Sequence, residues 1–229
     1  MDDIIYKILE VFKKNHLFDE GVELIGSWSF LLYQKHLGAP QFPLRTQDID
    51  FLIPNPFKGK IHKDFIDELI SLGFQKDYRR DGAVFLFNAE LLIEFITPEK
   101  GRGVEEAIAI KELGLKAIPL RFVNLLLDNP IRIVDQGIKI LVPNPANFCL
   151  HKLIISSRRR QPEKAIKDIQ QALYASVIVD KSNLLKIFMS LPKPWQKSIF
   201  TVLDKSVEIL PLDNDLIEVL KITLQGSKK

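Results

Sequence analysis

The hydrophobic positions in the first half of the chain switch repeatedly between helical and strand-like spacing. Some segments repeat apolar residues every three or four positions, others alternate them or run them together, and glycine or proline stands at many of the joints. The pattern predicts helices at 3–14, 28–37 and 61–72, and strands at 21–25, 48–53, 83–87 and 91–96. The segment 115–142 carries further β-rich pieces, notably at 121–127 and 138–142.

The pattern changes after the sequence Pro143-Asn144-Pro145. From Ala146 to the C-terminus the spacing is helical, with interruptions at 156–162 and 192–194. We therefore expect two domains, an α/β domain over 1–142 and an all-helical domain over 143–229.

Composition adds the expected compartment. Hydrophobic residues make up 46% of the 229 positions and charged residues 27%, which is typical of a globular protein. The one cysteine, Cys149, excludes an intramolecular disulfide. Neither a signal peptide nor an apolar run of membrane-spanning length is present, so we expect a soluble, cytoplasmic protein with no membrane partner.

The net charge of +3 hides a local excess of positive charge. Six basic residues and one acidic residue lie between His151 and Lys167. Arginine offers bidentate contacts to phosphate and lysine a mobile point charge, so one interpretation is a phosphate-binding surface. The other is a solvated helix face, with a Lys164–Asp168 pair at i, i+4 that contributes little.

Three acidic residues in strand-like segments are candidates for catalysis. Asp48 and Asp50 flank one apolar residue, so a strand places both carboxylates on one face, about 7 Å apart. Glu94 lies inside the apolar run 91–96, where burying an unpaired carboxylate is costly. If the two strands pair, three carboxylates converge and form oxygen ligands suited to Mg²⁺. Alternatively, the aspartates mark the end of an edge strand and Glu94 faces solvent.

Gly26-Ser27 lies between the predicted strand at 21–25 and the helix after it. Glycine allows close backbone approach, and the free N–H groups at a helix start bind anions. Ser27 is also a good N-cap, and the two functions are compatible.

The order of these motifs resembles that of the DNA polymerase β-like nucleotidyltransferase superfamily. Its signature is a Gly-Ser turn, an Asp-x-Asp strand and a later acidic strand, here Gly26-Ser27, 46–51 and 93–95. The segments 142–145, 151–153, 158–160 and 164–168 are similar to the helical part of bacterial nucleotidyltransferase-like proteins, some of which are toxins of toxin–antitoxin pairs. The resemblance covers about Gly21 to Ala175.

The resemblance implies an α/β (α+β) nucleotidyltransferase fold, with a mixed sheet flanked by helices and a C-terminal helical region. It implies a transferase that moves a nucleoside monophosphate from an NTP to a hydroxyl of RNA, protein or a small molecule and releases pyrophosphate. Two Mg²⁺ ions, or Mn²⁺ in their place, would be held at the acids. A catalytically silent nucleotide- or partner-binding relative, including a toxin–antitoxin component, is the alternative, and the oligomeric state stays open.

The resemblance also implies a role for each motif. The catalytic and metal-binding residues would be Asp48, Asp50 and Glu94, with Glu94 orienting or activating the acceptor hydroxyl. The nucleotide-binding residues would be Gly26, Ser27, Lys152, Arg158, Lys164, Lys167 and Asp168. Two departures from the family pattern are the glutamate at 94, where aspartate is usual, and the long spacing between Gly26 and Asp48.

Other candidates are assigned to structure. His151 stands between leucines and is expected to be a partly buried structural histidine, and Cys149 has no partner that would make it a nucleophile. The arginine run at 158–160 offers a nucleic-acid contact as an alternative to nucleotide binding. Phe85, Phe87 and Phe95 follow strand alternation and are expected in the core.

Overall fold

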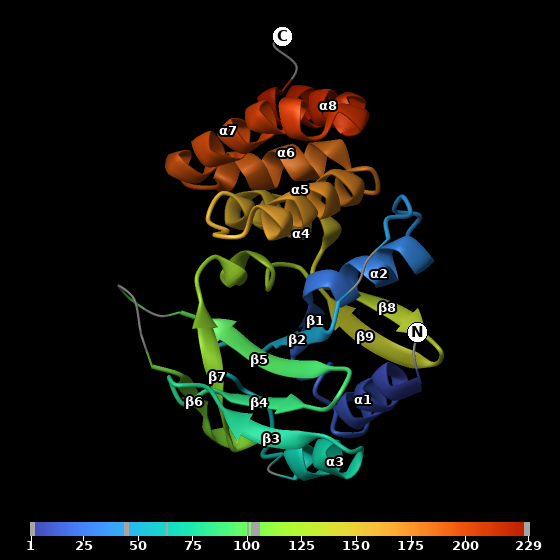
Figure 1. Ribbon diagram of the computed structural model, residues 1–229, viewed down its shortest axis with the longest axis vertical. Helices are drawn as coiled ribbons and strands as arrows, with labels where there is room; N and C mark the ends of the chain where they lie inside the picture. Colours follow the sequence, from blue (N-terminus) through green and yellow to red (C-terminus); the bar gives the residue numbers. More distant parts are fainter. Residues whose placement is uncertain (1–2, 44–45, 63, 100, 102–105, 227–229) are drawn as a thin grey trace. The chain divides into compact units, whose positions relative to one another are not determined.

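A computed structural model describes residues 3–43, 46–62, 64–99, 101 and 106–226 (Figure 1). The chain divides into two compact units, Met1–Leu32 with Pro43–Pro143, and Tyr33–Phe42 with Asn144–Lys229. The α/β class predicted from the sequence is confirmed.

The first unit holds a mixed sheet and the helices that cover it. Its helices are α1 (Asp3–Lys14), α3 (Phe65–Ser71) and most of α2 (Gly26–His36), with short 3₁₀ turns η1 (Lys111–Leu113) and η2 (Val123–Leu125). Its strands are β1 (Glu23–Ile25), β2 (Asp48–Leu52), β3 (Gln75–Tyr78), β4 (Val84–Phe87), β5 (Leu92–Pro98), β6 (Ile108–Ile110), β7 (Leu115–Leu120), β8 (Ile131–Asp135) and β9 (Ile138–Val142).

The sheet has the order β1-β2-β5-β4-β3 over the described residues, and β7 pairs with both β5 and β6. The β2–β5 and β5–β7 pairs are parallel and the others antiparallel, so the predicted mixed sheet is confirmed. The strands β5, β4 and β3 can be followed in this order in Figure 1. β8 and β9 form a separate antiparallel pair.

One face of the sheet is the core of this unit. Ile49 and Phe51 of β2 and Phe95 of β5 are almost completely buried on this face. Phe12 of α1 stacks on Phe51 with ring centroids 3.7 Å apart, and Phe65 of α3 meets Phe95 edge-on at 5.9 Å. The helices α1 and α3 therefore cover the sheet face opposite the one on which the three candidate acidic residues lie.

The segment predicted as β-rich at 121–127 is not a strand. Phe122 has a φ of +69° and η2 follows it, while the strand β7 ends at Leu120. The apolar side chains of Val123 and Leu126 pack on Ile25, Leu52 and Ile96 instead. The run is apolar because it covers part of the second sheet face, which explains its misleading strand-like composition.

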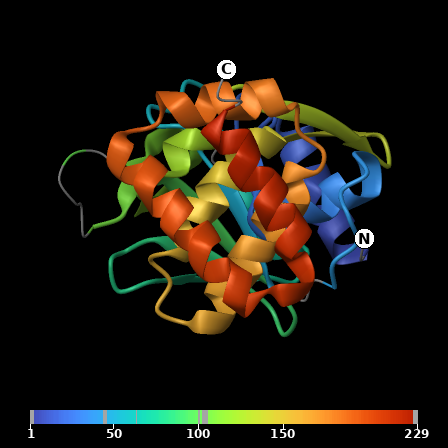
Figure 2. The ribbon, with the colours of Figure 1, turned by 90° about the horizontal axis from the view of Figure 1, so that it is seen from above.

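The second unit is helical, as predicted. It contains α4 (Pro145–Ser156), α5 (Pro162–Ser176), α6 (Lys181–Ser190), α7 (Lys193–Ile209), the turn η3 (Pro211–Asp213) and α8 (Asn214–Gln225). Asn144 caps α4 by accepting a hydrogen bond from Ala146 N, and Asp180 caps α6 by accepting one from Asn183 N. α4 packs against α5, α6 and α7 and is buried along most of its length. Figure 2 shows α7 and α8, which also pack on each other.

No helix among the described residues is long and apolar enough to span a bilayer.

Candidate active site

The predicted carboxylates lie on adjacent strands. β2 and β5 pair in parallel with Asp50 directly opposite Glu94, and Asp48 lies two residues before Asp50 on the same strand. Asp48 is exposed, while Asp50 and Glu94 are half-buried. Ile49 between the aspartates is fully buried on the opposite face. The strand pairing on which convergence of the three acids depended is therefore confirmed.

The Gly26-Ser27 turn lies beside these acids. Ile25, the last residue of β1, pairs with Asp50, and Gly26 begins α2 with a φ of +70°. A Cβ placed on Gly26 would lie only 2.6 Å from Asp50 Oδ2. Glycine is thus needed here both for the backbone angle and for the close approach of the carboxylate.

Trp28 holds the helix and the acidic strand in position. Its indole Nε1 donates a hydrogen bond of 3.0 Å to the carbonyl oxygen of Asp48, and the ring is 7% exposed. Ser29 Oγ donates to Gly26 O at 2.9 Å within the first turn. The N-terminus of α2, whose first backbone N–H groups have no intrahelical acceptor, is therefore fixed next to Asp48 and Asp50.

Arg79 is a site residue that the sequence did not suggest. Its guanidinium Nη2 forms an ion pair with Glu94 Oε1. Arg79 follows β3, a strand whose four residues are all exposed and which therefore shows no hydrophobic alternation. The sequence position of Arg79 is the one indication of this contact. Asp77 pairs with Phe85, and Phe85 pairs with Glu94, so these side chains lie on one face of the sheet. Arg79 stands two residues after Asp77 and is therefore expected on the same face.

Phe85 and Phe87 lie on the carboxylate face, and the expectation that they belong to the core is wrong. Phe85 pairs with Glu94 and Phe87 with Leu92, and both rings are half-buried. Their ring centroids are 5.8 Å apart. Phe95 alone of the three predicted core phenylalanines lies on the buried face, 1% exposed. The sequence pattern does not distinguish the faces because β4 and β5 are apolar on both.

The donor set partly fits a divalent cation. Asp48 and Asp50 offer hard carboxylate oxygens on one face, which suits Mg²⁺. Glu94, the third predicted ligand, is engaged by Arg79. Within the described part of the chain, no three or more His, Cys, Asp or Glu side chains are grouped so as to hold a metal ion. The roles of all three acids as metal ligands remain predictions.

In the helical unit, Asp168 is the centre of a buried ion-pair cluster. Its carboxylate accepts hydrogen bonds from Lys152 Nζ at 2.7 Å and from Arg159 Nε at 2.6 Å. Burial raises the pKa of Asp168, but the charges and hydrogen bonds of Lys152 and Arg159 outweigh it, so this pKa is below its ordinary value. Lys152 and Asp168 thus join α4 to α5, and their predicted nucleotide contacts have to be weighed against this function.

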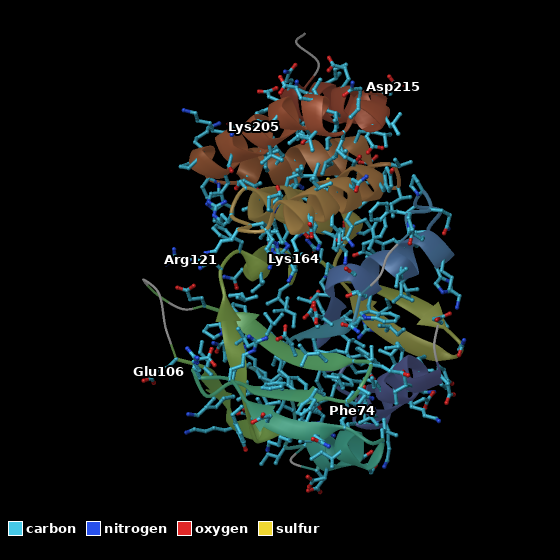
Figure 3. All side chains as sticks on the ribbon, viewed as in Figure 1. Phe74, Glu106, Arg121, Lys164, Lys205 and Asp215 are labelled. Carbon is cyan, nitrogen blue, oxygen red and sulfur yellow. The ribbon has the colours of Figure 1, made fainter. Side chains whose placement is uncertain are left out.

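The other predicted basic residues are arranged differently. Arg158 Nη1 donates to Ile154 O at 2.8 Å and so contacts the C-terminal end of α4. Lys164, labelled in Figure 3, is exposed, and Lys167 is half-buried on the same helix. Their roles in nucleotide binding remain predictions.

His151 and Cys149 are buried in α4. Burial, with Lys152 adding to it, lowers the pKa of His151 to about 3, and burial raises that of Cys149 to about 12. Both groups are therefore neutral near neutral pH, which agrees with the structural assignment of His151.

Residues 4–183 match the protein-family model for nucleotidyltransferases, which covers well over half of the chain. The chain belongs to this family of nucleotide-transferring enzymes.

Several solved structures are similar over most of their length. They include the solution structure of the antibiotic-resistance factor ANT(2'')-Ia, with 14% identity, a TM-score of 0.44 and coverage of 90% of this chain and 95% of that one. A crystal structure of ANT(2'')-Ia with adenylyl-2''-tobramycin has 12% identity, a TM-score of 0.44 and coverage of 80% and 92%. An antigenic nucleotidyltransferase-like protein from Paracoccidioides brasiliensis has 13% identity, a TM-score of 0.46 and coverage of 93% of each chain. A comparison with curated protein sequences found no match.

Proposed function

We propose that this enzyme transfers a nucleoside monophosphate from an NTP to a hydroxyl acceptor at the carboxylate face. The observation that carries the proposal is the register of Asp50 against Glu94, with Asp48 on the same face and the Gly26 turn beside Asp50. An anion-binding helix start next to closely spaced carboxylates suits a triphosphate bound with a divalent cation.

In the proposed reaction, the acceptor oxygen bonds to the α-phosphorus and the bond between that phosphorus and the bridging α,β-oxygen breaks. Pyrophosphate leaves. The ion pair between Arg79 and Glu94 opens, and the carboxylate of Glu94 then takes the hydroxyl proton. Asp48 and Asp50 would hold Mg²⁺, which when bound would neutralise phosphate charge and favour deprotonation of the hydroxyl. The backbone N–H groups of Gly26 and Ser27 contact the phosphates.

Basic residues of the helical unit also have a role in the proposed reaction. Arg158, Lys164 and Lys167 remain the proposed phosphate contacts, because lysine and arginine provide charge-assisted hydrogen bonds to phosphate oxygens. For Lys152 and Asp168 we propose a positioning role, since each already satisfies the other.

The test is label transfer from α-³²P NTPs to components of a cell extract in the presence of Mg²⁺. Asp50→Asn should remove labelling by about a hundredfold or more, since aligned catalytic groups contribute on this scale. Asp77→Asn is the matched control, because Asp77 is an exposed aspartate two strands from Glu94 on the same face. Equal labelling by wild type and Asp50→Asn contradicts the proposal.

The Arg79–Glu94 ion pair supports a second candidate function, a catalytically silent nucleotide-binding relative. In such a protein Glu94 remains with Arg79 and no third carboxylate reaches the cation. The silent form predicts Mg²⁺-dependent NTP binding with no labelling of any acceptor. Calorimetric titration with a non-hydrolysable NTP beside the labelling assay separates the two, because binding without turnover in a broad acceptor screen identifies the silent form.

A further inference from the structure

A pocket on the other side of the sheet has features of a separate ligand site. It lies between the β3–β4 hairpin and the segment from β6 through η1 to β7, with a volume of about 460 Å³. This lies within the range of roughly 300–1,000 Å³ usual for small-molecule sites. Val84 and Leu115 supply an apolar floor, and both are less than 5% exposed.

Three lysines, Lys76, Lys111 and Lys116, line this pocket. All three are exposed, and none has an ion pair with an acidic residue of the described chain. Lys116 Nζ lies 3.7 Å from the position that a Cβ on Gly82 would take, so its ammonium group reaches the hairpin turn. Three ammonium groups at one cavity attract a ligand with at least one anionic group.

Tyr78 adds an aromatic surface at the same pocket. Its side chain is 59% exposed although it belongs to a strand, and Lys76 Nζ lies 5.5 Å from the ring centroid. An exposed tyrosine with cations around it is the combination on which nucleobases stack while lysines contact the phosphate. An anion alone would use the lysines and leave the aromatic ring and apolar floor without a function.

The register of the sheet separates this pocket from the carboxylates. Lys76 pairs with Leu86 and Tyr78 with Val84, whereas Asp77 pairs with Phe85, which in turn pairs with Glu94. Because side chains alternate along a strand, Lys76 and Tyr78 point away from the carboxylate face. A ligand here is therefore distinct from an NTP held beside Asp50.

We propose that this lysine pocket binds a nucleotide, with the phosphate on Lys76, Lys111 and Lys116 and the base on Tyr78. The same chemistry is offered by a free mononucleotide and by the end of a single-stranded nucleic acid. The proposal does not rest on the transfer reaction, because the pocket uses none of the residues of the carboxylate face.

The experiment is calorimetric titration of the full chain carrying Asp48→Asn and Asp50→Asn, in EDTA, so that the carboxylate site is inactive and metal-free. The probes are AMP, ribose 5-phosphate and inorganic phosphate. AMP should bind about fivefold or more tightly than ribose 5-phosphate, since base stacking on an aromatic ring gives at least this factor. Tyr78→Leu should remove that difference, and Tyr78→Phe should retain it.

Charge reversal tests the lysines. Lys76→Glu with Lys116→Glu should weaken AMP binding by about tenfold or more, whereas Lys139→Glu with Lys186→Glu, at exposed sites outside the pocket, should leave it unchanged. Because the substituted lysines are exposed, the variants should keep the wild-type circular dichroism spectrum and Tm.

Two results would overturn the proposal: equal affinities of the Asp48→Asn/Asp50→Asn chain for AMP and ribose 5-phosphate, or AMP binding to that chain that survives the added Lys76/Lys116 reversal. An oligoadenylate added as a further probe distinguishes the source of the nucleotide. Tighter, more salt-dependent binding than AMP identifies a nucleic-acid strand, and an affinity equal to that of AMP identifies the free nucleotide.

Discussion

The backbone conformation of Gly26 helps to fix the position of Asp50, a proposed catalytic residue. Alanine at this site would have to keep a φ of +70° with its Cβ 2.6 Å from Asp50 Oδ2, so either the turn or the carboxylate must move. We expect Gly26→Ala to lower the Tm and reduce transfer activity by about tenfold or more, because small displacements of reacting groups are costly.

Gly137→Ala is the matched control for this prediction. Gly137 also has a positive φ, +80°, but nothing lies within 4 Å of an added Cβ. Gly137→Ala should lower the free energy of unfolding by the backbone strain alone, about 1–2 kcal/mol, and leave the activity unchanged. Thermal unfolding by circular dichroism and the labelling assay measure the two effects, and equal activity of both variants would refute a positional role for Gly26.

The buried carboxyl group of Glu23 makes the stability of the protein depend on pH. The residue is 1% exposed, and its Oε2 has no hydrogen-bond partner in the described structure. Burial, and then the charge of Asp128, raises the pKa of Glu23 from 4.5 to about 8. The folded protein therefore keeps a proton on Glu23 that the unfolded chain releases above pH 4.5.

Because the folded state binds the extra proton, the contribution of Glu23 to stability falls as the pH rises from 4.5 to about 8 and is constant above that. The slope for one group is about 1.4 kcal/mol per pH unit. Glu23→Gln should remove this part of the slope and be the more stable form above pH 8, with Glu90→Gln at an exposed turn as control. Urea unfolding across this range measures it, and parallel curves for wild type and Glu23→Gln would exclude a protonated Glu23.

At the scale of elements, the sequence predicts those helices and strands whose hydrophobic residues recur with a regular spacing. The predicted helix at 3–14 coincides with α1, and the strand predicted at 48–53 exceeds β2 by one residue, because each element has one buried face. β3 was missed because its four residues are exposed, and the segment 121–127 was misassigned because its apolar residues cover a sheet face from a 3₁₀ turn.

The same reasoning applies to the candidate site. Asp48, Asp50 and Glu94 were found because charged residues interrupt apolar strands, and that signal is local. The sequence does not indicate Arg79, because its contact with Glu94 depends on the register of the polar strand β3 on β4 and of β4 on β5. Pairing between strands distant in sequence is fixed by tertiary packing, which one sequence does not reveal.

The α4–α5 pair is held by a buried charge, and this gives a prediction for these two helices. Asp168→Asn leaves Lys152, whose side chain is 8% exposed, without its carboxylate. Removing one partner of a buried ion pair typically costs about 3–5 kcal/mol, whereas replacing both partners by apolar residues is close to neutral. We expect Asp168→Asn to be strongly destabilised in urea unfolding and Lys152→Met with Asp168→Leu to recover most of the loss.

The charge cluster also has a pH signature. Since the pKa of Asp168 is lowered in the folded state, its stabilising contribution is present above its ordinary value of 3.8 and is lost as the pH falls through the folded pKa. Destabilisation by Asp168→Asn should therefore shrink in acid. If Asp168→Asn instead raises the KM for NTP and leaves the unfolding free energy unchanged, Asp168 contacts the nucleotide as first predicted.

At the scale of the whole molecule, the helical unit is not one continuous segment. It includes Tyr33–Phe42 from the first part of the chain, so the division runs through α2 between Leu32 and Tyr33. Tyr33 meets the ring of Phe148 edge-on at 5.3 Å, and Phe42 meets that of Tyr174 at 5.7 Å. Chain order alone places the division near Pro143 and leaves these ten residues with the sheet.

A fragment of residues 144–229 should therefore be less stable than the same fragment with residues 33–42 joined to it by a flexible linker. Edge-on aromatic pairs contribute about 0.5–1.5 kcal/mol each beyond the area they bury, and a ring lost from a core costs about 3–5 kcal/mol. Tyr33→Ala with Phe42→Ala in the joined fragment is the control and should return its Tm to that of residues 144–229 alone. Thermal unfolding by circular dichroism gives the three values, and if all three coincide, residues 33–42 belong with the sheet and the helical unit begins after Pro143.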